Sequence, residues 1–214
     1  MDRRRAVRDT YDRIAAHFSQ TREYPWPEVE SFVDDAAPVG TALDLGCGNG
    51  RHAELLAERA DRVVGVDLSG ELLRTARDRA ADRGYAERLS LVGGDASSLP
   101  LRDASVGLGV YIAALHHLPS RAARRASLDE LARVLTPTGR ALVSVWSVTH
   151  SKFDAEEGFD TTVDWTLPGG ETVDRFYHVY DLGEFEADLA ASSLGVASAY
   201  ESEGNCYAVV TSGG

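Results

Sequence analysis

A cluster of glycines is the feature that most limits how this chain can fold. Gly46, Gly48 and Gly50 occupy three of five consecutive positions at the end of an apolar stretch. Such a turn between a strand and a helix lies at the carboxyl edge of an α/β sheet, where ligands bind. The third glycine of a dinucleotide fingerprint is missing, because Arg51 takes its place, and no G-K-[ST] phosphate loop follows. A backbone-touching ligand and a purely structural tight turn are both compatible with this pattern.

Short apolar runs alternate with amphipathic helical stretches along the rest of the chain. This alternation predicts an α/β fold with a parallel sheet covered on both faces. Ser69 and Ser120 are predicted helix N-caps. The last two runs are separated only by ESEGN, which predicts an antiparallel hairpin. The predicted strands span residues 41–46, 62–67, 89–93, 106–111, 140–146, 196–200 and 207–211.

Length and composition favour one domain over residues 1–214, since the 43% apolar content can fill a single core. Two segments fall outside the alternation: an N-terminal helical segment, 1–37, and an aromatic-rich insertion, 147–180. Neither a membrane span nor an apolar signal stretch is visible, so we expect a cytoplasmic location without membrane contact. Cys47 and Cys206 are too few for a disulfide framework or a metal site of this chain's own.

The charge balance is acidic, with 34 Asp and Glu residues against 22 Lys and Arg. Lys152 is the only lysine, and this composition favours a halophilic protein over an ordinary acidic enzyme. Basic residues nevertheless gather locally, and we expect them to contact phosphates unless they form paired or solvated helix faces. These clusters comprise Arg3, Arg4, Arg5, Arg8, Arg121, Arg124 and Arg125.

Acidic residues follow the next two predicted strands. Asp67 ends the second, where it suits the two hydroxyls of a ribose, and Asp95 follows the third, where it suits an adenine edge. Together with the glycines they indicate a nucleoside site without a phosphate site, which favours S-adenosylmethionine over three unrelated strand-end features. The predicted cofactor-binding residues are Asp44, Gly46, Cys47, Gly48, Gly50, Asp67, Leu68, Asp95, Ala96, Tyr111 and Ile112.

This constellation resembles the class I S-adenosylmethionine-dependent methyltransferases. The resemblance implies a Rossmann-like, seven-stranded sheet in the order 3-2-1-4-5-7-6 with strand 7 antiparallel. That topology agrees with the hairpin predicted from the last two strands.

A narrower resemblance rests on motifs along almost the whole chain. They read YDRIAAHFSQTREYPWP (11–27), YIAALHHLPSRAARRASLDELARVLTPTGRALVSVW (111–146), RFYHVY (175–180) and YESEGNCYAVV (200–210). These motifs are similar to tRNA methyltransferases that esterify the carboxymethyl group on wobble uridine together with a small zinc-binding activator. The resemblance implies tRNA and that activator as partners. Cys206 departs from the tryptophan usual in the final motif.

Methylating a carboxylate needs alignment rather than a strong base, because the group is already ionised at neutral pH. Donors must steer the carboxylate, and aromatic rings should sandwich the pyrimidine. The alternative for each candidate is a purely structural role, as a core residue, a strand residue or a surface residue in an ion pair. The predicted catalytic residues are Arg22, Trp26, His116, Arg175, Tyr177 and His178, with Trp146 as a further aromatic platform.

The implied strand order leaves residues 88–94 at a sheet edge that bears no lysine or proline. We expect the activator to add a strand there and form a heterodimer, unless the strand's shortness alone protects the edge. Two other functions stay open: a small-molecule carboxyl or oxygen methyltransferase of the same fold, and a non-catalytic cofactor-binding module.

Overall fold

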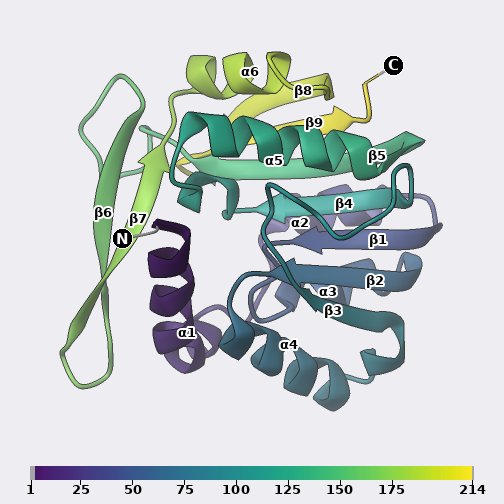
Figure 1. Ribbon diagram of the computed structural model, residues 1–214, viewed down its shortest axis with the longest axis horizontal. Helices are drawn as coiled ribbons and strands as arrows, with labels where there is room; N and C mark the ends of the chain where they lie inside the picture. The colour runs from purple at the N-terminus through teal and green to yellow at the C-terminus, as the bar shows by residue number, and fades with distance from the viewer. Residues whose placement is uncertain (1–2, 214) are drawn as a thin grey trace.

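A seven-stranded sheet forms the centre of the computed structural model, which describes residues 3–213 (Figure 1). The ends of the predicted domain, residues 1, 2 and 214, lie outside this range. The order β3-β2-β1-β4-β5-β9-β8 confirms the predicted topology, since β8 and β9 are the sixth and seventh strands of this sheet. Neighbours from β3 to β5 run parallel, and β9 is antiparallel to β5 and β8. The strands are β1 (Val39–Leu45), β2 (Ala60–Asp67), β3 (Leu89–Gly93), β4 (Val106–Ile112), β5 (Leu135–Trp146), β8 (Gly195–Ser202) and β9 (Asn205–Thr211).

Helices cover both faces of this sheet, as the alternating pattern predicted. One face packs against α5 (Arg121–Val134) and α6 (Leu182–Ala190), and the other against α2 (Pro27–Asp34), α3 (Arg51–Leu56) and α4 (Gly70–Asp82). The predicted caps are confirmed: Ser69 Oγ accepts from the Leu72 N–H at 3.1 Å, and Ser120 Oγ accepts from the Ala123 N–H at 3.2 Å. Two short 3-10 turns, η1 (Ala86–Arg88) and η2 (Leu115–His117), complete this part.

The insertion folds as a separate two-stranded antiparallel sheet, which the sequence interpretation did not anticipate. It consists of β6 (Phe159–Thr166) and β7 (Thr172–Val179). Buried residues alternate with exposed ones along it, as Val163, Trp165, Val173 and Arg175 show. This period of two is the pattern of a strand with one covered face.

Helix α1 (Arg3–Thr21) covers the carboxyl edge of the main sheet. Figure 1 shows it standing between the ends of β1, β2 and β4 and the β6–β7 hairpin. Ile14, fully buried, packs against Trp165 and Val173 of the hairpin. On the sheet side, Asp12 accepts from Ser69 Oγ at 2.7 Å. No helix within residues 3–213 is long and apolar enough to cross a membrane.

The arginine cluster on α5 is paired internally. Arg121 and Arg125 contact the fully buried carboxylate of Asp188 at 2.6 and 2.9 Å, and Arg124 lies 3.9 Å from Glu184. These pairs join α5 to α6. The cluster therefore matches the paired-face alternative better than the expected phosphate contact.

Candidate active site

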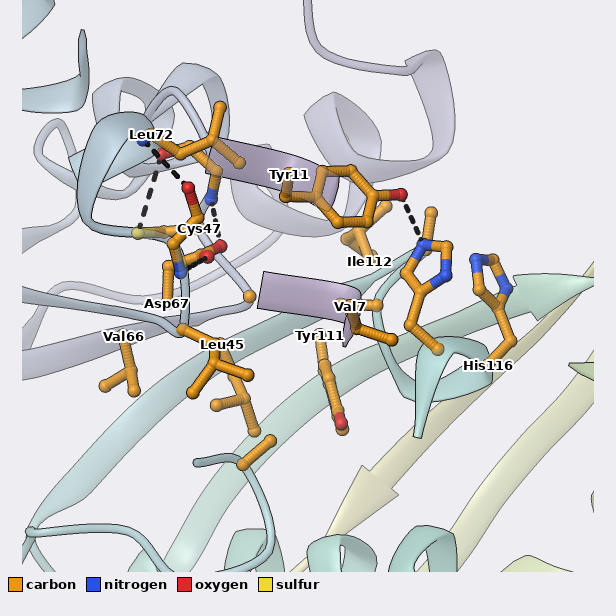
Figure 2. Close-up of a pocket in the computed structure, with 18 of the residues that line it drawn as sticks. Val7, Tyr11, Leu45, Cys47, Val66, Asp67, Leu72, Tyr111, Ile112 and His116 are labelled. Atoms are coloured by element: carbon orange, nitrogen blue, oxygen red, sulfur yellow. Dashed lines mark hydrogen bonds between the residues drawn. The ribbon is translucent and has the colours of Figure 1, made fainter. Parts of the chain in front are cut away.

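A pocket opens at the carboxyl edge of the sheet, between the glycine turn, α1, η2 and β7 (Figure 2). It collects most of the predicted residues. The cofactor candidates that line it are Gly46, Cys47, Gly48, Asp67, Leu68, Asp95, Ala96, Tyr111 and Ile112. The acceptor candidates that line it are Arg22, Trp26, His116, Arg175 and Tyr177, and Trp146 joins them.

Two of the three glycines in the turn are explained by packing within the protein. All three have positive φ angles of 70°, 52° and 76°, which disfavour other residues. A Cβ on Gly46 would stand 2.3 Å from the Cβ of Ala114, and one on Gly50 would stand 3.1 Å from the Cβ of Ala76. Gly48 lines the pocket, and the nearest atom to its added Cβ would belong to Phe18 of α1, at 3.7 Å. Gly50 does not line the pocket.

Asp67 ends β2 and holds the turn in place. Its Oδ2 accepts from the Gly48 N–H and its Oδ1 from the Ser69 N–H, both at 2.8 Å (Figure 2). Burial raises the pKa of Asp67, while the N–H donors of Ser69 and Gly48 counteract this shift. A carboxylate offers about four acceptor positions, so two are left for hydroxyl groups of a bound ribose.

Asp95 lies beyond β3 and is engaged on both oxygens. Oδ1 accepts from the Ser97 N–H and hydroxyl, each at 2.8 Å. Oδ2 lies 2.7 Å from the guanidinium of Arg4 on α1. The predicted adenine acid is therefore also a contact point for the covering helix.

Apolar side chains form the wall between these two acids. Figure 2 shows Leu45, Val66, Leu72, Tyr111 and Ile112 around this part of the pocket. An apolar cavity with a few placed polar groups is typical of cofactor sites. The combination of this wall, Gly48 and the acceptor capacity of Asp67 fits the nucleoside part of S-adenosylmethionine.

Asp44 does not line the pocket, although it was predicted to bind the cofactor. Its side chain is 1% exposed within β1, and its Oδ2 has no hydrogen-bond partner among the described residues. Burial, together with the charge of Asp67, raises the pKa of Asp44 to about 7, and Arg51 counteracts the shift. Asp44 therefore lies in the core beneath the turn, where its carboxyl group stays protonated up to about pH 7.

The acceptor end of the pocket is rich in arginine. Arg175 and Arg22 lie over the same Trp165 ring, 4.7 and 5.5 Å from its centroid. Arg51 lies 5.5 Å from the centroid of Trp26. Within residues 3–213, none of these three arginines pairs with a carboxylate, whereas Arg4, which also lines the pocket, lies 2.7 Å from Asp95. This end therefore offers unpaired positive charge on aromatic supports.

His116 presents a hydrogen-bond donor to this end. Its Nδ1 accepts from the Trp146 backbone N–H at 3.0 Å, which places the proton of the neutral ring on Nε2. The residue is 1% exposed, and Nε2 has no partner among the described residues. Burial lowers the pKa of His116 well below 6.5, so the ring is neutral. Figure 2 shows the ring at the pocket wall, and its centroid lies 4.9 Å from the centroid of the Tyr177 ring.

Several residues at the site were missed by the sequence interpretation. The Tyr11 hydroxyl lies 2.7 Å from Nε2 of His117, whose Nδ1 donates to the Phe176 carbonyl at 2.8 Å (Figure 2). This relay joins α1 to η2 and β7. Tyr11 and His117 lie within quoted motifs, and Arg51 follows the glycine cluster, but only contacts between distant segments reveal their places.

His178 is not brought to the pocket. Its ring nitrogens lie 2.8 Å from Asp160 and 3.0 Å from Glu184. Successive side chains of a strand point to opposite faces, so His178 points away from the face that carries Arg175 and Tyr177. The structure therefore corrects the prediction that His178 belongs to the acceptor site.

Known proteins share parts of this sequence and fold. Residues 43–143 match the methyltransferase domain family. The matched segment runs from β1 to β5 of the main sheet. In fold it is similar to the CcbJ methyltransferase of Streptomyces caelestis, with a TM-score of 0.76, 17% identity and coverage of 98% of each chain. A complex between the Haloferax volcanii Trm112 methyltransferase activator and a methyltransferase also matches, with a TM-score of 0.72, 19% identity and coverage of 97% and 98%.

Sequence relatives carry the activity that the motifs predicted. The chain is 34% identical over 141 residues to an Arabidopsis thaliana tRNA (carboxymethyluridine(34)-5-O)-methyltransferase, covering 66% of this chain and 32% of the relative. The Saccharomyces cerevisiae protein of the same name is 32% identical over 167 residues, covering 76% and 57%. The chain thus spans 32% and 57% of the length of these two curated relatives.

The first prediction concerns Asp67. Asp67→Asn keeps the shape but exchanges one acceptor for a donor, and lost charge-assisted hydrogen bonds are worth about 1.5–3 kcal/mol each. We expect S-adenosylmethionine to bind about tenfold to a hundredfold more weakly by calorimetry. Asp61→Asn, at an exposed position of the same strand, is the matched control. Equal affinities in the two variants would remove Asp67 from the cofactor site.

The second prediction concerns Asp44 and pH. The unfolded carboxyl, with its ordinary pKa of 3.8, is ionised at pH 5, but the folded one stays protonated up to about pH 7. Raising the pH from 5 to 8 should therefore lower the free energy of unfolding by about 3 kcal/mol through this residue. The decrease accumulates up to about pH 7 and stops above it, where the carboxyl is ionised in both states. Denaturant unfolding at both pH values should show a smaller drop for Asp44→Asn than for wild type or Asp61→Asn. Parallel drops would contradict the prediction.

Proposed function

We propose that this chain uses S-adenosylmethionine to methylate the carboxymethyl group on wobble uridine of tRNA, giving the methyl ester, in the cytoplasm. The observation that most directly supports this proposal comes from the acceptor end of the pocket. Three arginines there, Arg22, Arg51 and Arg175, have no carboxylate partner among the described residues. The chain has a formal net charge of −12, so a pocket that keeps unpaired arginines is suited to an anionic group. The names of the sequence relatives support the same acceptor.

The chemistry requires orientation of two groups. S-adenosylmethionine, when bound, supplies a methyl group on a positively charged sulfur. The acceptor carboxylate is ionised at neutral pH, so no residue has to remove a proton from it. Arg175 and Arg22 bind the carboxylate, and His116 donates from Nε2 to the oxygen that does not react. Such alignment of reacting atoms can supply several kcal/mol of barrier reduction.

The character of these groups suits a reaction in which charge disappears. An oxygen–carbon bond forms, a sulfur–carbon bond breaks, and a negative and a positive group become neutral. Aromatic rings exclude water here, as the stacked pair Trp146 and Tyr177, with centroids 4.4 Å apart, illustrates. Replacing water by such walls disfavours the separated charges more than the transition state. A neutral donor such as His116 orients the carboxylate without holding its charge as strongly as a cation would.

A small carboxylic acid is the second candidate acceptor. The observation that favours it is the cover formed by α1, whose Arg4 reaches Asp95 and whose Tyr11 reaches His117 across the pocket. A nucleotide within an RNA loop needs a wider entrance than a free acid. The arginine-rich end serves either acceptor, so the choice between them rests on the motifs and the relatives.

The proposed partner is a small zinc-binding activator that pairs with β3. This strand lies at the sheet edge, pairs with β2 alone among the described strands, and has half-exposed side chains along its length. An unpaired edge favours addition of a strand from another chain. The fold similarity to a methyltransferase found in complex with Trm112 supports this kind of partner. In this proposal the zinc belongs to the activator, and the described residues of this chain contain no group of three or more His, Cys, Asp or Glu placed to hold a metal ion.

The third prediction tests the activity and Arg175 together. In cells that lack this protein, mass spectrometry of tRNA nucleosides should find carboxymethyluridine or its derivatives in place of the ester. Wild type should restore the ester, whereas Arg175→Lys should restore under about a tenth of it, because lysine lacks the planar fork of donors. Arg77→Lys, at an exposed position of α4, is the control.

Two outcomes would contradict this prediction. Unchanged tRNA nucleosides, with methyl esters of small acids missing instead, would favour the second acceptor. Full restoration by Arg175→Lys would remove that arginine from the mechanism. Cofactor affinity, measured separately by calorimetry, should be the same in both variants and wild type.

The fourth prediction concerns the activator. Adding it should slow amide hydrogen exchange in β3, because its strand would supply partners for outward N–H groups. The opposite edge strand, β8, is also exposed and serves as an internal control that should not change. Protection of β8 but not β3 would place the activator at the other edge. Unchanged exchange at both edges would exclude strand addition.

A further inference from the structure

Tyr24 is the most exposed large apolar side chain in the described part of the protein. It is 72% exposed and lies in the loop between α1 and α2. Arg22 and Trp26, two residues away on either side, both line the acceptor end of the pocket. The Tyr24 backbone therefore runs beside that pocket, and its exposed ring lies outside the lining.

The backbone that carries this ring is held firmly, although it is neither helix nor strand. Three consecutive carbonyls are each bound by a side chain from a different segment. Asn49 donates to the Arg22 carbonyl at 2.9 Å, Arg79 to that of Glu23 at 3.0 Å, and Arg51 to that of Tyr24 at 3.2 Å. Pro25 follows Tyr24 and further restricts its backbone.

These three hydrogen bonds connect the loop that carries Tyr24 to the pocket. Asn49 belongs to the glycine turn and Arg51 begins α3, and both line the cavity. Arg83 adds a contact of 3.1 Å to the Glu23 carboxylate, so the acidic neighbour of Tyr24 is neutralised. An exposed ring on a fixed backbone loses little conformational entropy on binding, which is the advantage of a preorganised contact.

We propose that Tyr24 stacks on the RNA base next to the nucleotide that is methylated. This inference rests on the proposed function, and it names the part of the substrate outside the pocket. An acceptor base that enters a closed pocket must leave its stack, so its neighbour loses a stacking partner. An exposed aromatic face beside the pocket replaces that partner.

The experiment compares two substrates for the chain in complex with its activator. One is an anticodon stem-loop that carries carboxymethyluridine, and the other is the free nucleoside. Tyr24→Ala should lower kcat/KM about tenfold on the stem-loop, the effect of losing one stacked base, and leave the nucleoside unchanged. Tyr24→Phe should retain activity. Tyr200→Ala is the matched control, because Tyr200 is also exposed but already stacks on Tyr207.

A binding measurement separates stacking from other causes. Stem-loops with 2-aminopurine at either neighbouring position should lose fluorescence on binding wild type or Tyr24→Phe, but not Tyr24→Ala. An equal loss of activity on both substrates would give Tyr24 a structural role and overturn the inference. Weaker activator binding with unchanged stem-loop activity would assign Tyr24 to a protein contact instead. A wild-type complex that methylates neither substrate overturns the proposed function itself.

Discussion

The hydrogen bonds of Asp67 are the constraint on which the site depends. One carboxylate fixes the N–H groups of Gly48 and Ser69, and thereby joins the turn after β1 to the start of α4. Ser69 in turn donates its hydroxyl to Asp12 on α1. A chain of contacts thus runs from the glycine turn to the helix that covers the pocket. The strand-tip acid shapes the cavity before any ligand is bound.

Charge is distributed so that the pocket differs from the surface around it. On α5, Arg121 and Arg125 are paired with the buried carboxylate of Asp188. At the acceptor end, aromatic rings take the place of carboxylates, and Trp165 supports both Arg22 and Arg175. A ring supports a guanidinium without neutralising it. The acidic chain thereby keeps positive charge at the acceptor end of the pocket.

The fold could be predicted from the sequence, and the residues proposed for the cofactor half follow from local patterns at strand ends. Strand order came from the resemblance and agreed with the short ESEGN turn, and Asp67 was found at a strand end. The acceptor half depends on pairing between distant segments, which periodicity does not specify. The position of Tyr11 against His117 is one such case. His178 was assigned wrongly although alternation with Tyr177 already indicated opposite faces.

The insertion and α1 connect the two halves of the site. As a hairpin it carries Arg175 on one face, and Trp165 and Val173 of the same hairpin pack on Ile14 of α1. The same helix bonds Ser69 through Asp12, next to the cofactor end. Displacing α1 to admit a ligand at either end therefore loosens contacts at the other. The hairpin and α1 therefore form one wall that contacts both ends of the pocket.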